Sequence, residues 1–255
     1  MPAASPALDN FRDLGGLSGP DGRIRAGLLM RGALPRDLPD EITTATAPLT
    51  VVDFRSTAES DHSPNPLRDR RDIRYLPLPI GGNAAAWVKQ LFARMGSDPF
   101  PGDALRAEFL RAFRTIPVAN EDGLRRFFDA LRAAPGPVFF HCTAGKDRTG
   151  IAAALLLHAL GINRDAVLAD FLATNGAVNL PARAAQMARR LEKRLGRPVD
   201  PDHLHPLVGV EEAFLDAAFD AIRDHAGSVD AYIAHNMGWC EATRAQMRDK
   251  WMEPA

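Results

Sequence analysis

Short apolar runs separated by polar stretches are the clearest pattern along the chain. Residues 24–30, 49–54, 73–78 and 138–140 are rich in β-branched or other apolar side chains and have the lengths of strands. The runs at 49–54 and 138–140 are β-branched or apolar at most positions and do not alternate, as in strands buried on both faces of a parallel sheet. We therefore expect a central, mostly parallel sheet of about four to five strands.

Longer stretches with apolar residues at helical spacing fill the intervals. They are 38–45, 83–116, 120–133, 149–160, 163–174, 178–195, 210–225, 228–236 and 239–251. Asn120 is the expected N-cap of its helix. Residues 57–72 read as a polar loop, and residues 1–8 as a loose tail. The alternation predicts an α/β fold with helices flanking the sheet, in a single domain over residues 1–255.

One stretch reads as two amphipathic helices around a Gly/Pro break. It covers residues 83–116, with the break at 96–102, and we expect it to be a helical lid. Its apolar face is more typical of core packing than of lipid binding. The residues on that face are Trp87, Leu91, Phe92, Phe109, Leu110 and Phe113.

Composition excludes several classes of protein. The formal net charge is −1, so no global basic field would attract nucleic acid. Cys142 and Cys240 are the only cysteines, which is too few for a disulfide framework. No stretch has the length and apolarity of a transmembrane helix. A thiol that must stay reduced fits a cytoplasmic location.

The stretch His-Cys-Thr-Ala-Gly-Lys-Asp-Arg-Thr-Gly at 141–150 carries the candidate chemistry. It links a buried strand to an apolar helix, and the free N–H groups of a helix start attract an anion. Gly145 lets the backbone curl, and a thiol at Cys142 close to Lys146 and Arg148 should ionise below its ordinary pKa. Arg148 presents a planar fork that suits two phosphoryl oxygens.

These residues predict phosphomonoester hydrolysis through a cysteinyl-phosphate, with no metal or other cofactor. Cys142 would attack phosphorus, and Arg148 would bind the phosphoryl group, with added charge from Lys146. Backbone N–H groups of Thr143, Ala144, Gly145 and their neighbours would complete the phosphate site. Cys142 as a small buried hydrophobe and a sulfurtransferase site are the alternatives. His203 and His205 have no carboxylate or cysteine cluster nearby in the sequence, and we expect no metal there.

The pattern Cys-x5-Arg-Thr resembles the loop of cysteine-dependent protein tyrosine phosphatases. The fuller loop is similar to the bacterial tyrosine and phosphoinositide phosphatases, as are residues 10–16 (Asn-Phe-Arg-Asp-Leu-Gly-Gly), 27–32 and 51–56. The resemblance implies that residues 10–16 pack near the loop and orient it. It also implies that the Thr149 hydroxyl faces the Cys142 sulfur. Because some relatives are exported without an obvious signal, export is the alternative to the cytoplasmic location.

The substrate implied by the resemblance is a phosphotyrosyl protein, with inorganic phosphate as product. A lysine at the position of Lys146 resembles lipid phosphatases, so a phosphoinositide or dual-specificity phosphatase is the main rival. Helix 178–195 and its end carry Arg183, Arg190, Arg194 and Arg197 at near-helical spacing. A solvated face is the favoured interpretation, and a basic wall for a phosphoinositide headgroup or acidic peptide is the alternative.

The chain departs from this family where relatives carry a general acid. After Leu-Pro-Leu-Pro at 76–79 stands Ile80, which cannot donate a proton. Asp147 is the first candidate acid, and the alternative role for its carboxylate is to accept backbone N–H bonds. Asp53 and the lid residues Asp98 and Asp103 are further candidates, although Asp53 is expected to pair with Arg55. A phosphate-binding module with little turnover therefore stays a third hypothesis.

Overall fold

A five-stranded sheet forms the centre of the computed structural model, which describes residues 9–36, 48–81, 102–177 and 179–254. In spatial order its strands are β1 (Arg12–Asp13), β4 (Leu29–Gly32), β7 (Val138–His141), β5 (Leu49–Asp53) and β6 (Ile73–Pro77). All neighbours run parallel except β1, which is antiparallel to β4. The expected mostly parallel sheet is confirmed.

Strand β7 lies in the middle of this sheet, and its last residue decides where the loop begins. His141 is level with Gly32 of β4 and with Asp53 of β5. The carboxyl ends of the three strands therefore lie at one edge, where α/β proteins place their ligand sites.

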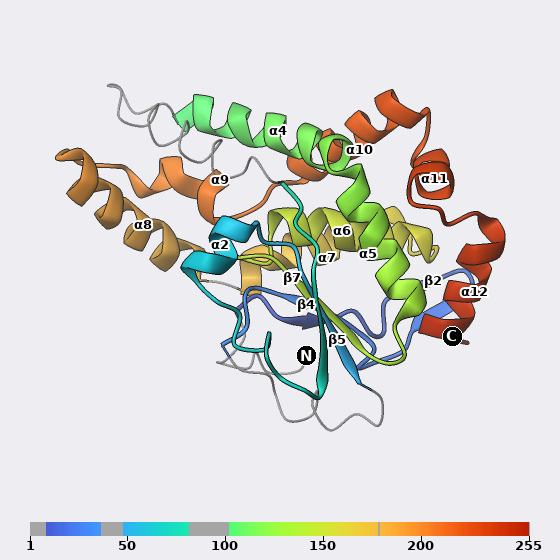
Figure 1. The fold of residues 1–255 in the computed structure, drawn as a ribbon. Helices are drawn as coiled ribbons and strands as arrows, with labels where there is room; N and C mark the ends of the chain where they lie inside the picture. The colour runs from blue at the N-terminus through green and yellow to red at the C-terminus, as the bar shows by residue number, and fades with distance from the viewer. Residues whose placement is uncertain (1–8, 37–47, 82–101, 178, 255) are drawn as a thin grey trace.

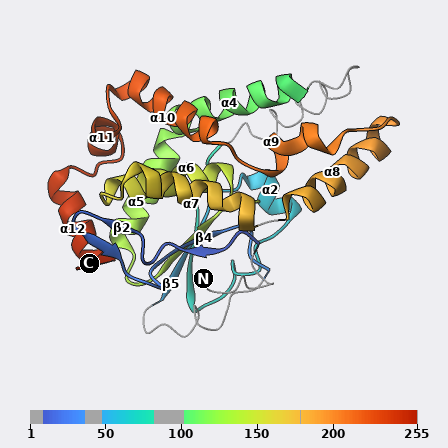
Figure 2. The ribbon, with the colours of Figure 1, turned by 180° about the vertical axis from the view of Figure 1, so that it is seen from behind.

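Most helices lie on one side of the sheet, and loops cover the other side (Figures 1 and 2). The helices are α2 (Thr57–His62), α4 (Gly102–Ala119), α5 (Glu121–Ala133), α6 (Asp147–Ala159), α7 (Arg164–Ala177), α8 (Leu180–Leu195), η1 (Pro201–Leu204), α9 (His205–Val208), α10 (Glu212–Ala226), α11 (Val229–Ala231), η2 (Tyr232–Asn236) and α12 (Glu241–Trp251). The apolar helix α6 is almost entirely buried, as expected for the helix behind the loop. None of the helices in the described part of the chain is long and apolar enough to cross a membrane.

The described half of the expected lid packs as core. Helix α4 stacks Phe109 and Phe113 on Phe214 of α10, with ring centroids 5.8 and 5.2 Å apart. Phe113 also meets Phe171 of α7 edge-on. This confirms the core interpretation for α4, while residues 82–101, and with them Trp87 and Asp98, lie outside the described residues.

A second sheet of three short strands corrects one strand prediction. Residues 24–30 were expected to form one strand, but β3 (Gly22–Ile24) ends before a turn and β4 begins at Leu29. Gly27 adopts φ +75° in that turn. β3 pairs with β2 (Ser18–Gly19) and with β8 (Met252–Glu253) from the far end of the chain. This long-range pairing decides the boundary.

Two other stretches also differ from expectation. Residues 57–72 were expected to be loop, but they begin with α2, whose N-terminus carries a reciprocal cap between Ser56 and Glu59. Asn120 precedes α5 without a side-chain cap, because its amide oxygen accepts the Gly81 N–H at 2.6 Å. The predicted helix 38–45 lies outside the described residues.

Candidate functional site

The loop after β7 curls tightly against the end of β4. Cys142 directly follows the strand and is 3% exposed. Gly145 adopts φ +68°, and a Cβ there would lie 2.3 Å from the backbone of Gly32. Only glycine fits both the left-handed conformation and this close approach.

Every carbonyl from residue 142 to residue 146 accepts a hydrogen bond from a group other than the loop's own N–H groups. The donors, in chain order of the carbonyls, are His141 Nδ1 (2.9 Å), Leu34 N (3.2 Å), Asn10 Nδ2 (3.1 Å), Arg31 Nη2 (3.0 Å) and Gly150 N (2.9 Å). Within a trans peptide the N–H points opposite to the C=O. The N–H groups of residues 143–146 accordingly turn to the inner side of the loop, and none donates a hydrogen bond within the described residues. This is the geometry of an anion cradle.

Residues 10–16, the N-terminal element, support the underside of this cradle. Asn10, at φ 55°, bonds the Ala144 carbonyl, and Arg12 donates to Asp170 of α7 at 2.9 Å. Asp170 also accepts from Arg31 at 2.5 Å. Burial lowers the pKa of Arg31 to about 10, although the charge of Asp170 acts to raise it, and the guanidinium stays charged at neutral pH. The expected packing of residues 10–16 near the loop is confirmed.

Arg148 is held by a carboxylate that the sequence did not reveal. Its Nη1 and Nη2 atoms each lie 2.7 Å from a different oxygen of Glu59, and the Thr143 hydroxyl donates to the same carboxylate at 2.6 Å. Burial alone would raise the pKa of Glu59, but the hydrogen bonds and charge of Arg148 lower it to about 2. Burial acts to lower the pKa of Arg148, and the bonds to Glu59 outweigh it and raise that pKa. The pair is therefore ionised at neutral pH.

The sequence contains a signal for the position of Glu59. Ser56-Thr57-Ala58-Glu59 has the Ser-x-x-Glu spacing of a capping box, which predicts a helix start after the strand that ends at Asp53. That signal places Glu59 in a first helical turn at the site edge. It does not predict the contact with Arg148.

Comparison with known proteins decides the family. A model described as "Tyrosine phosphatase family" matches residues 4–253. The chain belongs to the tyrosine phosphatase family. It is 34% identical to a protein of Cupriavidus necator that is named as a tyrosine-protein phosphatase, over 98% of this chain and 88% of that protein. It is 30% identical to a protein of Mycobacterium tuberculosis named triple specificity protein phosphatase PtpB, over 95% of this chain and 96% of that protein.

Similarity to a solved structure is much weaker. Crystal structures of P. aeruginosa TpbA, one of them with pTyr, cover 81% of this chain at 20% identity, with TM-scores of 0.32 and 0.31. Family membership thus rests on the sequence comparisons, and they identify the protein as a protein-tyrosine phosphatase, a phosphoric monoester hydrolase with the family's α/β fold.

Lys146 of this phosphatase is directed away from the cradle. Its Nζ donates to the carbonyls of Pro206 and Gly209 at 2.9 and 3.0 Å and lies 4.7 Å above the Phe109 ring. It also lies 3.1 Å from Asp147 Oδ1, in ion-pair contact without hydrogen-bond geometry. This differs from the expectation that Lys146 adds charge to bound phosphate, because its ammonium is engaged with the α9 segment.

Asp53 does not have the environment of a general acid. Its carboxylate accepts from Arg55 Nε and Nη2 (3.0 and 2.7 Å) and from the Tyr75 hydroxyl (2.7 Å). Burial acts to raise its pKa, but the Arg55 hydrogen bonds and these neighbours lower it overall. The expected pairing with Arg55 is confirmed, and the protonated form that an acid needs is disfavoured.

The other candidate groups lie in different settings. Asp147 begins α6, with its side chain 28% exposed. Thr149 is fully buried, and its hydroxyl has no hydrogen-bond partner among the described residues, so its expected contact with the Cys142 sulfur stays a prediction. Ile80 is also fully buried. Asp103 lies in the first turn of α4.

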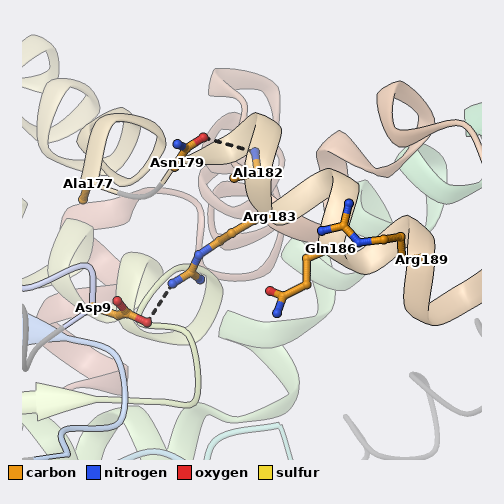
Figure 3. Close-up of a pocket in the computed structure, with 7 residues that line it drawn as sticks. All are labelled: Asp9, Ala177, Asn179, Ala182, Arg183, Gln186 and Arg189. Carbon is orange, nitrogen blue, oxygen red and sulfur yellow. Dashed lines mark hydrogen bonds and ion pairs between the residues drawn. The ribbon is translucent and has the colours of Figure 1, made fainter.

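Most basic residues of α8 lie on its exposed side. The helix buries Ala184, Ala188 and Leu191, and its exposed side includes Arg189, Arg190, Lys193 and Arg194. A shallow hollow beside it is lined by Asp9, Ala177, Asn179, Ala182, Arg183, Gln186 and Arg189 (Figure 3). Arg183 donates to Asp9 there at 2.8 Å. The loop does not line this hollow. Of the four predicted arginines, Arg190 and Arg194 are exposed, as on a solvated face, whereas Arg183 and Arg197 are half-buried.

Proposed function

We propose that the phosphatase hydrolyses phosphomonoesters through a cysteinyl-phosphate at Cys142, without a metal, and acts best on phosphotyrosine. The observation that carries this proposal is the cradle, in which the outward-bonded carbonyls of residues 142–145 turn the N–H groups of residues 143–146 inward beside the Cys142 thiol. An anion seated there would meet N–H groups and the guanidinium of Arg148 together. Thiolate attack then breaks the P–O bond, and water later releases phosphate.

Asp147 is the proposed acid for the leaving oxygen. Glu59 cannot take this role, because its pKa of about 2 keeps it ionised at neutral pH. Asp53 is disfavoured by its bonds to Arg55 and Tyr75. Asp147 is partly exposed at the start of α6, and Lys146 is its ion-pair partner among the described residues. A proton on Asp147 would help an alkoxide leave more than a phenolate, since the phenolate is the better leaving group.

A phosphoinositide or dual-specificity activity is the alternative. It is supported by the M. tuberculosis relative, which is named a triple specificity protein phosphatase. The buried position of Lys146 weighs against a headgroup contact by its ammonium. Comparison of phosphate release from a phosphotyrosyl peptide and from inositol phospholipid vesicles separates the two activities.

The test is hydrolysis of para-nitrophenyl phosphate in EDTA by the wild type, Cys142→Ser and Cys240→Ser. We expect full activity in the wild type and in the Cys240 variant, whose thiol is exposed. We expect none in Cys142→Ser, although this variant should still bind phosphate. Activity that persists in Cys142→Ser refutes the mechanism. Phosphate binding without turnover in the wild type would favour the binding-module hypothesis.

A further inference from the structure

Asn65, in the loop after α2, lies against the histidine that precedes Cys142. The side chain of Asn65 is nearly buried, at 4% exposure. Its Oδ1 accepts the N–H of Leu67 at 2.9 Å, and its Nδ2 lies 2.9 Å from His141 Nε2. Because Oδ1 must face a donor, the amide orientation is fixed, and the NH₂ group faces the imidazole.

This contact determines the protonation of His141. A donor facing Nε2 requires that Nε2 carry a lone pair and no proton. The proton of the neutral ring is then on Nδ1, where the Cys142 carbonyl lies 2.9 Å away as an acceptor. Burial, the largest influence, lowers the pKa of His141, which agrees with a neutral ring.

A nearby carboxylate favours the opposite tautomer. Asp53 Oδ2 lies 3.8 Å from His141 Nε2 and would attract a proton to that nitrogen. The other charged groups that act on the ring are Arg55 and Arg148, which disfavour its protonation, and Tyr75 is bonded to Asp53. Without the Asn65 amide, the field of Asp53 would favour a proton on Nε2, against the Nδ1–H bond to the Cys142 carbonyl. With the proton on Nε2, a bare Nδ1 would face the carbonyl oxygen at 2.9 Å.

We propose that Asn65 is a positioning residue that sets the Nδ1–H tautomer of His141 and thereby orients the Cys142–Thr143 peptide. The C=O and N–H of that peptide point in opposite directions. Fixing the carbonyl on His141 therefore aims the Thr143 N–H into the cradle. The anion-binding part of this proposal rests on the proposed function, and the tautomer part does not.

The first test is nitrogen-15 NMR of the His141 ring in the full-length wild type and in Asn65→Leu. We expect a protonated Nδ1 and a bare Nε2 in the wild type, and a proton on Nε2 in Asn65→Leu. Phosphate or vanadate affinity of the variant should fall about tenfold or more, as for one lost hydrogen bond to an anion. An Nε2–H ring in the wild type, or an unchanged tautomer in the variant, overturns the proposal.

Asn65→Asp separates the effect of Asn65 on the His141 tautomer from its hydrogen bond with the Leu67 N–H. The aspartate keeps an acceptor for the Leu67 N–H but presents an acceptor to His141. We expect the ring to be protonated on both nitrogens at neutral pH, with phosphate affinity close to the wild-type value, because Nδ1–H is kept. A bare Nε2 in Asn65→Asp overturns the proposal, and so does an altered tautomer with unchanged anion affinity in Asn65→Leu. The ring signals need no turnover, so they decide the tautomer even if the proposed function fails.

Discussion

The ion pair between Glu59 and Arg148 should contribute measurably to the free energy of unfolding. The substitution Glu59→Gln removes the charge and one of the two acceptor oxygens that Arg148 contacts at 2.7 Å. The Arg148 side chain is 12% exposed and would lose its charge partner. We therefore expect the variant to fold less stably at neutral pH.

The pKa of Glu59 gives the magnitude and the sign. It falls from the ordinary 4.5 to about 2, and at about 1.36 kcal/mol per unit this corresponds to about 3 kcal/mol. Since the carboxylate is 27% exposed, solvent screening reduces the expected value to about 2 kcal/mol. The folded-state pKa is depressed, so this stabilisation is complete above about pH 4.5 and is lost as the pH falls toward about 2.

Urea unfolding of the wild type and Glu59→Gln at several pH values measures this difference. We expect about 2 kcal/mol at about pH 7, shrinking steadily below about pH 4.5. Glu253→Gln is the control, because the Arg23–Glu253 pair is 54% and 41% exposed and should contribute under about 1 kcal/mol. A difference between wild type and Glu59→Gln that stays constant down to about pH 3 would refute the assignment to the ionised pair.

Three further substitutions test the loop and its support. Asp147→Asn should abolish the falling limb of kcat at high pH, and it should reduce hydrolysis of alkyl phosphates more than hydrolysis of para-nitrophenyl phosphate. Equal losses of kcat for the two kinds of substrate, measured across pH, would contradict its role as acid. Gly145→Ala should lower the free energy of unfolding in urea by several times the roughly 1 kcal/mol expected for Gly196→Ala. Gly196 has a similar φ of +70° but open space around it, whereas a Cβ at Gly145 would clash with the backbone of Gly32. Asp170→Asn should lower stability by about 3–5 kcal/mol in thermal unfolding, because it leaves buried Arg31 without its carboxylate; a loss under about 1 kcal/mol would exclude this.

The parts of the site that are contiguous in the sequence could be predicted. Cys142 and Gly145 lie in the loop between an apolar strand and an apolar helix, Arg148 lies in the first turn of that helix, and both elements formed as expected. Strands β5 and β6 also formed close to their predicted limits. Local composition was sufficient there because β-branched and apolar residues predominate in both strands, although only β5 is buried throughout and the edge strand β6 exposes Arg74 and Pro77.

Contacts between distant residues could not be predicted in the same way. Arg31 and Asp170 are 139 positions apart, and Glu59 and Arg148 are 89 apart. Glu59 and Arg148 lie in first helical turns, Arg31 lies in β4 and Asp170 lies in the middle of α7, and the neighbours of each in the sequence do not reveal its partner. Only the tertiary fold brings each cation to a carboxylate, and burial then makes the pairing necessary.

The shape of the cradle is consequently a property of the whole fold more than of the loop sequence. The carbonyls of residues 142–146 are bonded by donors from the N-terminal element, from β4 and the residues after it, from the end of β7 and from α6. The glycine and the helix start allow the loop to curl, but they do not by themselves fix each peptide plane. Because the outward bonds fix the planes before any ligand arrives, the N–H groups need little reorganisation when an anion binds. A motif match therefore identifies the chemistry, while the residues that set its geometry lie in segments that the motif does not include.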